Sequence, residues 1–330
     1  MLWDGIARRA FGLGGGGGEE AGPVPAPETR TRPRLGLALG AGAARGWSHI
    51  GILRALEQGG IVPDVITGCS VGAVVGGCYA AGKLDEVEAF ARSLSKRRVM
   101  GLLDFHISGS GLIAGDRLRG LLEAQLSEHR IETLPLRFAT VATELGTGHE
   151  IWLTRGPLVD AMRASYALPG VFGPVRVGGR WLMDGALVNP VPITGARTLG
   201  ADIVVCVNLS GDVRLRGTVI HAHPAEEEAV NEALLDEPRR WGLLPLRPGK
   251  RSDAPGIATV MVDAFNITQD RIARSRLAGD PPDVMICPKL APIGLFEFHR
   301  ADEAIELGRQ AAERALPDIR ELIQETSRVA

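Results

Sequence analysis

The sequence predicts an α/β fold in which a mainly parallel β-sheet is flanked by helices. From Arg34 onward, short apolar segments of strand length alternate with longer segments of helical periodicity. The first of them follow the order strand, glycine-rich loop, helix, strand, tight turn, helix, which is typical of parallel strands with helices on the sheet faces. With 330 residues, the chain is long enough for one large domain of this kind or two small ones.

The individual elements follow from these patterns. The predicted strands are Leu35–Leu39, Val65–Thr67, Arg137–Thr143, His149–Thr154, Val175–Val177, Trp181–Met183, Ala201–Val207 and Val284–Cys287. The predicted helices are Trp47–Glu57, Val71–Ala81, 84–94, 116–122, Pro157–Ser165, Ile267–Leu277 and Ala301–Ala315. Turns containing glycine join 137–143 to 149–154 and 175–177 to 181–183, so both pairs are predicted hairpins.

The composition changes along the chain and indicates four segments. Residues 1–33 contain five consecutive glycines and then a proline-rich stretch, which predicts a flexible tail. The alternative for the first residues is a small amphipathic helix that contacts a membrane. Residues 34–210 form the predicted core, 211–256 are polar and predict an irregular insertion, and 257–330 supply a strand and helices that complete the domain.

The sequence favours a protein without a signal peptide or membrane span. Asp4, Arg8 and Arg9 interrupt the apolar residues near the N-terminus, whereas a signal peptide has a continuous apolar core. Residues 65–82 carry no formal charge, but their five glycines favour a buried strand, turn and helix over a span. We expect a cytoplasmic protein that can lie at the inner face of the membrane.

The composition argues against several classes of function. A net charge of −2 and 5% aromatic residues predict no surface for phosphate backbones or stacked bases, so nucleic acid is not an expected partner. Cys69, Cys78, Cys206 and Cys287 form no C-x-x-C pair and lie in or beside apolar segments, which favours buried thiols. The seven histidines show no metal-binding spacing. We expect no metal and no other cofactor.

The strongest functional signal is Gly68-Cys69-Ser70-Val71-Gly72, a G-x-S-x-G sequence between a predicted strand and a predicted helix. In this context a sharp turn displays the serine hydroxyl, and the flanking glycines allow close approach of neighbouring backbone. The positive end of the following helix favours developing negative charge. Ser70 is therefore the predicted nucleophile, whereas Cys69 points away in such a turn. The alternative is a plain turn in which Ser70 caps the helix.

The loop between the first strand and the first helix, Gly40-Ala41-Gly42-Ala43-Ala44-Arg45-Gly46, is the predicted oxyanion hole. Its small residues let backbone N–H groups point into a cleft, where each can stabilise a transition state by about 3 kcal/mol. Arg45 either adds positive charge near the site or anchors the loop to a carboxylate. A dinucleotide-binding loop is the main alternative, but G-x-G-x-x-R lacks the third glycine, and Asp64 precedes the second strand instead of ending it.

Asp184-Gly185-Ala186 follows the predicted strand Trp181–Met183 and contains the candidate base. Asp-Gly is also a common turn pair, so the motif alone is weak. Its weight comes from the need for a proton acceptor, since Ser70 must lose its proton to attack. A carboxylate with a reference pKa of about 4 needs burial, a short hydrogen bond and a strong oxyanion hole to serve as this base.

Serine hydrolases normally use histidine as the base. Here His221 and His223 lie in the predicted insertion, and His299 lies beside a helix start. His49 lies inside the first predicted helix and is interpreted as a structural residue. None ends a predicted strand, so Asp184 remains as the direct base.

Three segments in this order, GLALGAGAARGWSHIGILRALE, GCSVGAVVGGCYAAG and MDGALVNPVPI, resemble the bacterial patatin-like phospholipase family, and its stress-response-regulator-like subgroup in particular. The resemblance covers residues 34–210 and implies a modified α/β/α sandwich with a patatin-like lipase core and a calcium-independent Ser-Asp dyad. It implies Ser70 as nucleophile, Asp184 as proton acceptor and the amides of Gly42, Ala43 and Ala44 as oxyanion donors, with Arg45 as the basic loop residue. The sequence departs from the family pattern at Ala41 and Ala43, where glycine is usual.

The predicted function is hydrolysis of a lipid ester through an acyl-enzyme at Ser70. We expect a lipid or another acyl ester as the partner, with a membrane surface as a place to meet it. Residues 167–175 are a candidate lining for the acyl chain, and a plain core segment is the alternative. Two further functions stay open: a regulatory or membrane-interacting protein of this fold with little turnover, and an α/β-hydrolase esterase that uses a histidine. The head group, the acyl-chain length and the oligomeric state are not predicted.

Overall fold

The computed structural model of the protein describes residues 32–102, 116–211 and 257–329. The strands of the described residues are β1 (Leu35–Leu39), β2 (Val65–Cys69), β3 (Arg137–Glu144), β4 (Glu150–Leu153), β5 (Val175–Val177), β6 (Arg180–Asp184), β7 (Ile203–Val207) and β8 (Val284–Ile286). The α-helices are α2 (Ser48–Gln58), α3 (Val71–Ala80), α4 (Leu84–Arg92), α5 (Lys96–Leu102), α6 (Asp116–Leu126), α7 (Leu158–Tyr166), α8 (Ile193–Thr198), α10 (Ile257–Gly279) and α11 (Ala301–Val329). Short 3₁₀ turns are η1 (Ala43–Trp47), η2 (Ile131–Thr133), η3 (Gly185–Leu187) and η4 (Phe298–Arg300).

The strands form one mixed sheet in the order β5-β6-β3-β2-β1-β7-β8, with β4 paired to β3. The neighbouring pairs β3–β2, β2–β1, β1–β7 and β7–β8 are parallel, while β4, β5 and β6 are antiparallel to their neighbours. Both predicted hairpins, β3–β4 and β5–β6, are confirmed. The sheet is therefore mainly parallel in its centre, as the sequence predicts.

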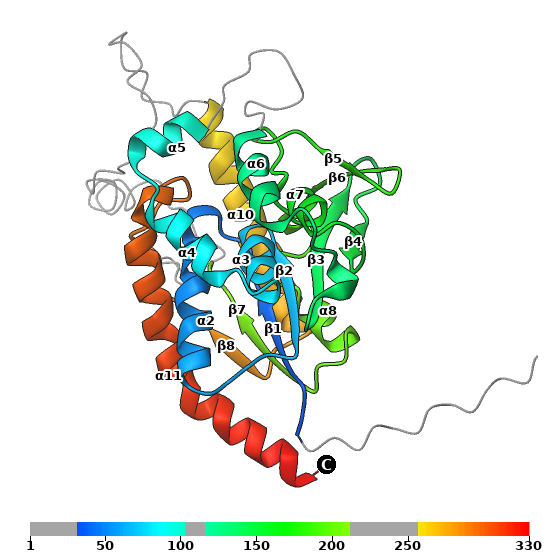
Figure 1. The fold of residues 1–330 in the computed structure, drawn as a ribbon, viewed down its shortest axis with the longest axis vertical. Helices are drawn as coiled ribbons and strands as arrows, with labels where there is room; N and C mark the ends of the chain where they lie inside the picture. The colour runs from blue at the N-terminus through cyan, green and yellow to red at the C-terminus, as the bar shows by residue number, and fades with distance from the viewer. Residues whose placement is uncertain (1–31, 103–115, 212–256, 330) are drawn as a thin grey trace, which may run out of the picture. The chain divides into compact units, whose positions relative to one another are not determined.

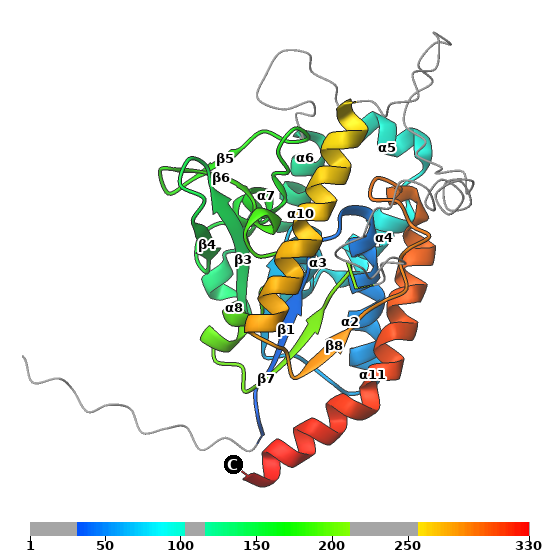
Figure 2. The ribbon, with the colours of Figure 1, turned by 180° about the vertical axis from the view of Figure 1, so that it is seen from behind.

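Each face of the sheet is covered by helices, which makes three layers. Alternate residues of β1 show why: Leu35, Leu37 and Leu39 pack into the large core with α2, α3 and α11, while Ala38 packs on the opposite face against α8. Figure 1 shows α2 and α3 before the sheet, and Figure 2 shows α10 crossing the other face. Buried strands of this kind read as continuous apolar segments because both faces are covered.

The pairing of β3 explains how distant residues meet. Along β3, residues through Val141 pair with β2, and residues from Ala142 pair with β6. Strand β4 pairs with residues 140–143, which overlap both sets, so β4 must occupy one edge of β3 and leave the other edge to β2 and β6. Strands β2 and β6 run in opposite directions, so their carboxyl ends meet head-on. Cys69 and Asp184 are the residues at that junction.

Several helices differ from the sequence prediction. The 3₁₀ turn η1 precedes the predicted helix Trp47–Glu57, which begins as α2 at Ser48. The helix predicted at 267–277 is the second half of the longer α10, and α11 continues well beyond Ala315. Two short helices, α5 and α8, were not predicted. Such short helices depend on tertiary packing, because helices of this length are marginal alone.

The predicted tail and the predicted insertion lie almost wholly outside the described residues, in 1–31 and 212–256. Arg32, which falls inside the predicted tail, donates two hydrogen bonds to the carboxylate of Asp64, at 2.7 and 2.8 Å. Residue 32 therefore belongs with the fold. Among the described helices, none has the length and apolar character that crossing a membrane requires.

Candidate active site

Ser70 lies at the junction of β2 and α3 in a strained backbone conformation. Its φ of 54° and ψ of −123° fall in a region that residues with a side chain rarely adopt. Gly72 permits this turn, since a Cβ there would lie 2.2 Å from the carbonyl oxygen of Leu39. The turn thus needs glycine because neighbouring backbone approaches closely, as the G-x-S-x-G sequence predicts. Strain of this kind persists only where the surrounding structure fixes it.

The side chains of Ser70 and Asp184 are in direct contact. Ser70 Oγ donates a hydrogen bond to Asp184 Oδ2 at 2.8 Å. Asp184 ends β6 and Ser70 follows β2, so the head-on meeting of these strands brings the two residues together. Asp184 is 2% exposed and Ser70 is 8% exposed, so the pair is nearly shielded from water. The sequence predicts both residues, and the structure brings them together.

The backbone around Asp184 fixes its carboxylate. Asp184 Oδ1 accepts a hydrogen bond from the N–H of Ala186 at 2.9 Å, which leaves Oδ2 for Ser70. The Asp184 N–H donates to the carbonyl of Ala167, and the hydroxyl of Thr143 donates to the Asp184 carbonyl. Gly185 is required here, because a Cβ would lie 2.3 Å from the carbonyl oxygen of Val141. The carboxylate is therefore held in one orientation by both of its oxygens.

Burial changes the proton affinity of the site. It raises the pKa of Asp184 to about 7, and the hydrogen bonds from Ala186 and Ser70 offset the shift only in part. At neutral pH the carboxyl group can therefore both take and return a proton. Burial also raises the pKa of the neighbouring Cys69 well above its usual value, and the charge of Asp184 adds to the shift. Cys69 is thus held as a thiol, which agrees with its interpretation as a structural residue.

The glycine-rich loop places two N–H groups without a described acceptor at the start of η1. Among the described residues, the amides of Gly42 and Ala43 have no acceptor, while the amide of Ala44 donates to the carbonyl of Leu295 at 2.9 Å. The expected role of Ala44 as an oxyanion donor does not fit this geometry, because its N–H is already engaged. The amide of Arg45 donates to the carbonyl of Gly42 at 3.1 Å. Gly42 and Ala43 remain as the candidates in this loop.

Arg45 holds the loop to a distant segment. Its Nε donates to the carbonyl of Ile293 at 2.8 Å. Of the two roles left open by the sequence, anchoring the loop matches this contact, although the described acceptor is a backbone carbonyl instead of a carboxylate. Ala43 has a φ of 47°, in the left-handed region that favours glycine. The departure from glycine at this position therefore strains the loop and does not remove its amide.

Two other groups near Ser70 were not predicted from sequence. Ser165, at the end of α7, accepts a hydrogen bond from the Ser70 N–H at 2.9 Å and donates to the carbonyl of Val141 at 2.6 Å. It is fully buried and supports the strained turn. A serine inside a predicted helix carries no signal for such a role. The N–H of Val71 opens α3 without an acceptor among the described residues and is a third candidate oxyanion donor.

The histidines that the structure describes are not partners of Ser70. His49 Nε2 lies 2.8 Å from the carbonyl of Gly40, and burial lowers its pKa to about 4. A carbonyl only accepts, so Nε2 carries a hydrogen and the neutral ring supports the loop. His299 lies in η4 and makes no described hydrogen bond to Ser70 or Asp184. His221 and His223 lie outside the described residues.

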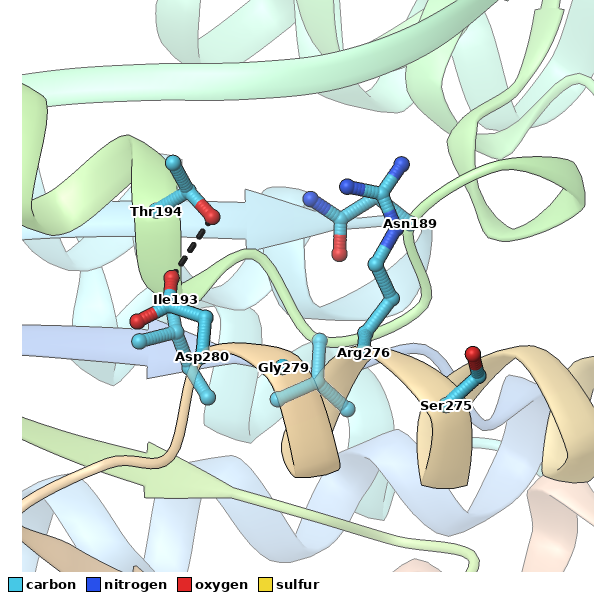
Figure 3. A pocket seen from close by; sticks show the side chains of 8 residues that line it. Asn189, Ile193, Thr194, Ser275, Arg276, Gly279 and Asp280 are labelled. Atoms are coloured by element: carbon cyan, nitrogen blue, oxygen red, sulfur yellow. Dashed lines mark hydrogen bonds between the residues drawn. The ribbon is translucent and has the colours of Figure 1, made fainter.

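A separate cavity of about 240 Å³ lies between the segment after Asp184 and the end of α10, and it contains neither Ser70 nor Asp184. Figure 3 shows Asn189 and Arg276 at one side of it and Thr194 with Asp280 at the other. Asn189 and Arg276 both donate to the carboxylate of Glu150, at 2.7 and 2.9 Å. Glu150 therefore ties β4, α10 and the segment after Asp184 together beside this cavity.

Comparisons with known proteins show what this chain is similar to. A family model described as patatin-like phospholipase matches residues 37–197. An uncharacterized NTE family protein of Mycobacterium tuberculosis is 35% identical over 320 residues, covering 83% of this chain and 88% of the relative. Lysophospholipase NTE1 of Pyricularia oryzae is 28% identical over 273 residues, covering 80% of this chain and 17% of that protein. A solved structure, VipD from Legionella pneumophila, is similar with a TM-score of 0.42 at 14% identity, covering 88% of this chain and 67% of that one.

The protein is a three-layer α/β fold in which a serine at a strand-to-helix turn contacts a buried carboxylate. The family match and the bacterial relatives are more specific: the chain belongs to the patatin-like phospholipase family. The resemblance to the patatin-like family that its three motifs predict is confirmed, and the subgroup stays a prediction.

Proposed function

We propose that this protein hydrolyses carboxylic esters of lipids, with Ser70 as nucleophile and Asp184 as the direct base. One observation carries the proposal: a serine hydroxyl in a strained strand-to-helix turn donates a 2.8 Å hydrogen bond to a buried carboxylate. The family of the chain supports a lipid as the substrate class. One of its relatives, from Pyricularia oryzae, is named a lysophospholipase, which supports the same class of ester.

In the first half-reaction, Ser70 Oγ attacks the ester carbonyl carbon while its proton moves to Asp184 Oδ2. The carbonyl oxygen gains the negative charge and meets the free N–H groups of Gly42 and Ala43 and that of Val71. As the intermediate collapses, the C–O bond to the alcohol breaks, and Asp184 returns the proton to the leaving oxygen. The products of this step are the free alcohol or lysolipid and an acyl group bound to Ser70.

In the second half-reaction, water takes the place of the alcohol. Asp184 accepts a proton from the water, whose oxygen attacks the acyl carbon, and the same amides hold the new oxyanion. The bond to Ser70 Oγ then breaks, the proton returns to Ser70, and a fatty acid leaves. One water is consumed for each ester cleaved, and every proton is carried by Asp184.

The segment 167–175 is proposed to line the acyl-chain path. Its backbone is joined to the dyad by the hydrogen bond from Asp184 N to the Ala167 carbonyl. Residues 168 and 171–175 are half-buried, and Phe172 packs edge-on against Tyr166 with ring centroids 5.4 Å apart. This partial burial leaves apolar surface near the ester, which a fatty-acyl chain could cover.

A regulatory protein with little turnover is the second candidate, because Ala43 strains the loop and the amide of Ala44 is engaged. A serine-reactive phosphonate separates the two. It should label the wild-type chain at Ser70 and leave Ser70→Ala unlabelled, whereas an unlabelled wild type favours the regulatory function.

The base is tested with a chromogenic acyl ester. Turnover should be lost in Asp184→Asn and retained when His221, His223 and His299 are replaced in turn. Loss of turnover on removal of one histidine would establish the triad of an α/β-hydrolase esterase and overturn the dyad. Chelators should leave the rate unchanged, because each proposed step uses groups of the protein alone.

A further inference from the structure

Helix α10 covers the catalytic junction with one of its faces. Phe265 packs against Ala41, Cys69 and Ala186, which come from the oxyanion loop, the strand before Ser70 and the segment after Asp184. Further along, Ala273 is buried against the central sheet. Figure 2 shows the first half of α10, in yellow, extending past the arrowhead of β1, whose carboxyl end bears the glycine-rich loop. This half of the helix is therefore anchored beside the dyad.

The opposite side of the same half exposes large apolar side chains. Val260, Met261 and Ile267 are 48%, 59% and 60% exposed, and Ala264 between them is exposed as well. At 100° per residue, these four positions lie on one side of the helix. We call this set, Val260, Met261, Ala264 and Ile267, the α10 apolar face. An amphipathic helix that is fixed by its inner face has no folding reason to expose such residues.

The α10 apolar face adjoins a segment that is hydrogen-bonded to the dyad. A Cβ placed on Gly170 would lie 3.7 Å from Met261 Cε, so Met261 adjoins the segment 167–175. That segment accepts the hydrogen bond from Asp184 N at Ala167. A molecule bound on the apolar face therefore lies next to the segment proposed to receive the acyl chain.

Positive charge accompanies this face. Arg271 is exposed one turn beyond Ile267 on the same side of α10. Lys96, Arg97 and Arg98, all exposed, begin α5, which lies at the same end of the molecule as the start of α10 in Figures 1 and 2. Within the described ranges, none of these four cations has a salt bridge to an acidic residue.

The acidic residues of α10 offset this charge only in part. Asp263 is half-buried, and Asp270 pairs with Arg274 at 2.8 Å. Among the described residues of α10 and of the start of α5, the exposed charges without a salt bridge are thus positive, which favours an anionic surface and opposes a second copy of the same chain.

We propose that the α10 apolar face and the cations of α5 dock this protein on an anionic lipid bilayer, so that lipid esters pass from the bilayer along the segment 167–175 to Ser70. The proposal rests on the proposed lipid hydrolysis for its purpose, but the binding can be measured without turnover. Apolar side chains beside clustered cations are the combination that binds a helix to the surface of an anionic bilayer. The occupant is the bilayer itself.

The experiment is sedimentation of full-length Ser70→Ala protein with vesicles of phosphatidylcholine alone or mixed equally with phosphatidylglycerol. We expect binding to the anionic vesicles and little to the neutral ones. Adding Met261→Gln and Ile267→Gln together should lower the partition coefficient about tenfold or more, because two apolar side chains no longer enter the bilayer. Adding Arg97→Ser and Arg98→Ser instead should lower it about fivefold for each cation.

The matched control is Val62→Gln, which removes a side chain of similar exposure, 56%, just before β2 and hence at the opposite end of the strands. It should bind as the parent does. Equal binding by the Met261/Ile267 variant and the control would overturn the proposal. So would a change in oligomeric mass of that variant with unchanged vesicle binding, since the face would then be a contact between copies.

Failure of the proposed function has a different signature. If wild-type protein binds anionic vesicles but neither cleaves a soluble acyl ester nor reacts with a phosphonate, the docking proposal is supported and the proposed hydrolysis is wrong. If wild-type protein cleaves the soluble ester but does not bind the vesicles, the proposed hydrolysis is supported and the docking proposal is wrong.

Discussion

The burial of Asp184 predicts that its replacement by asparagine stabilises the fold in a pH-dependent way. The pKa of this carboxyl group is raised by burial from 3.8 to about 7. Between these two pH values, the folded protein keeps a proton that the unfolded chain has released. The free energy of unfolding therefore falls as the pH rises through this range. An asparagine side chain at this position has no charge to bury. Asp184→Asn also keeps an oxygen for the Ala186 N–H and the size of the side chain.

The magnitude follows from the shift. A difference of about 3 units in pKa corresponds to about 4 kcal/mol of folding free energy above pH 7, at 1.36 kcal/mol per unit. At pH 5 the folded acid is still neutral while the unfolded one is ionised, and the corresponding loss is about 1.7 kcal/mol. The advantage of Asp184→Asn over wild type should therefore grow by about 2–3 kcal/mol between pH 5 and pH 8.

The measurement is urea unfolding of both proteins at a series of pH values. Subtracting the two free energies of unfolding removes the contribution of every other titrating group. A difference that stays flat from pH 5 to pH 8, or that favours wild type at pH 8, would show that burial does not raise the pKa of Asp184. In the same range, wild-type turnover should rise with pH and level off above about 7, because the base must be ionised.

Two further predictions concern the turn at Ser70. Gly72→Ala should unfold at clearly lower urea concentration than wild type and lose activity, because its Cβ would lie 2.2 Å from backbone. Gly120→Ala in α6 is the control: it has open space around the added Cβ and should be at least as stable as wild type. Equal effects of the two substitutions would contradict the packing argument. Ser165→Ala leaves the buried Ser70 N–H and Val141 carbonyl without this partner, so urea unfolding should show a loss of about 1–3 kcal/mol. An unchanged midpoint and unchanged turnover in Ser165→Ala would show that the strained turn does not need this support.

Both residues of the proposed dyad could be named from the sequence because local patterns contain them. A strand, a G-x-S-x-G turn and a helix identify Ser70, and the Asp-Gly pair that ends a hairpin strand identifies Asp184. Their contact could not be derived from residue patterns alone. It depends on the edge of β3 to which β6 pairs, and strand register is decided by long-range packing.

The donors were only partly predictable for the same reason. Small residues indicate that the amides from Gly42 to Ala44 can approach a ligand, but which of them stay free depends on segments far along the chain. Ala44 is engaged by Leu295, in the segment between β8 and η4. Ser165 had no signal at all, since its role arises only when the end of α7 meets the turn after β2. Sequence patterns thus identify candidate reactive residues, whereas tertiary packing determines which groups those residues contact.

The choice of a carboxylate as the proposed base has a physical reason in this fold. Burial disfavours the charged form of any group, so it raises the pKa of an acid and lowers that of a histidine. Two buried side chains, one in the dyad and one beneath the glycine-rich loop, show both directions: the pKa of Asp184 rises to about 7, and that of His49 falls to about 4. An unburied histidine has a pKa of about 6.5. At the closed junction of β2 and β6, a carboxyl group therefore acquires the proton affinity that an exposed imidazole has, while an imidazole in the same place would become too weak a base.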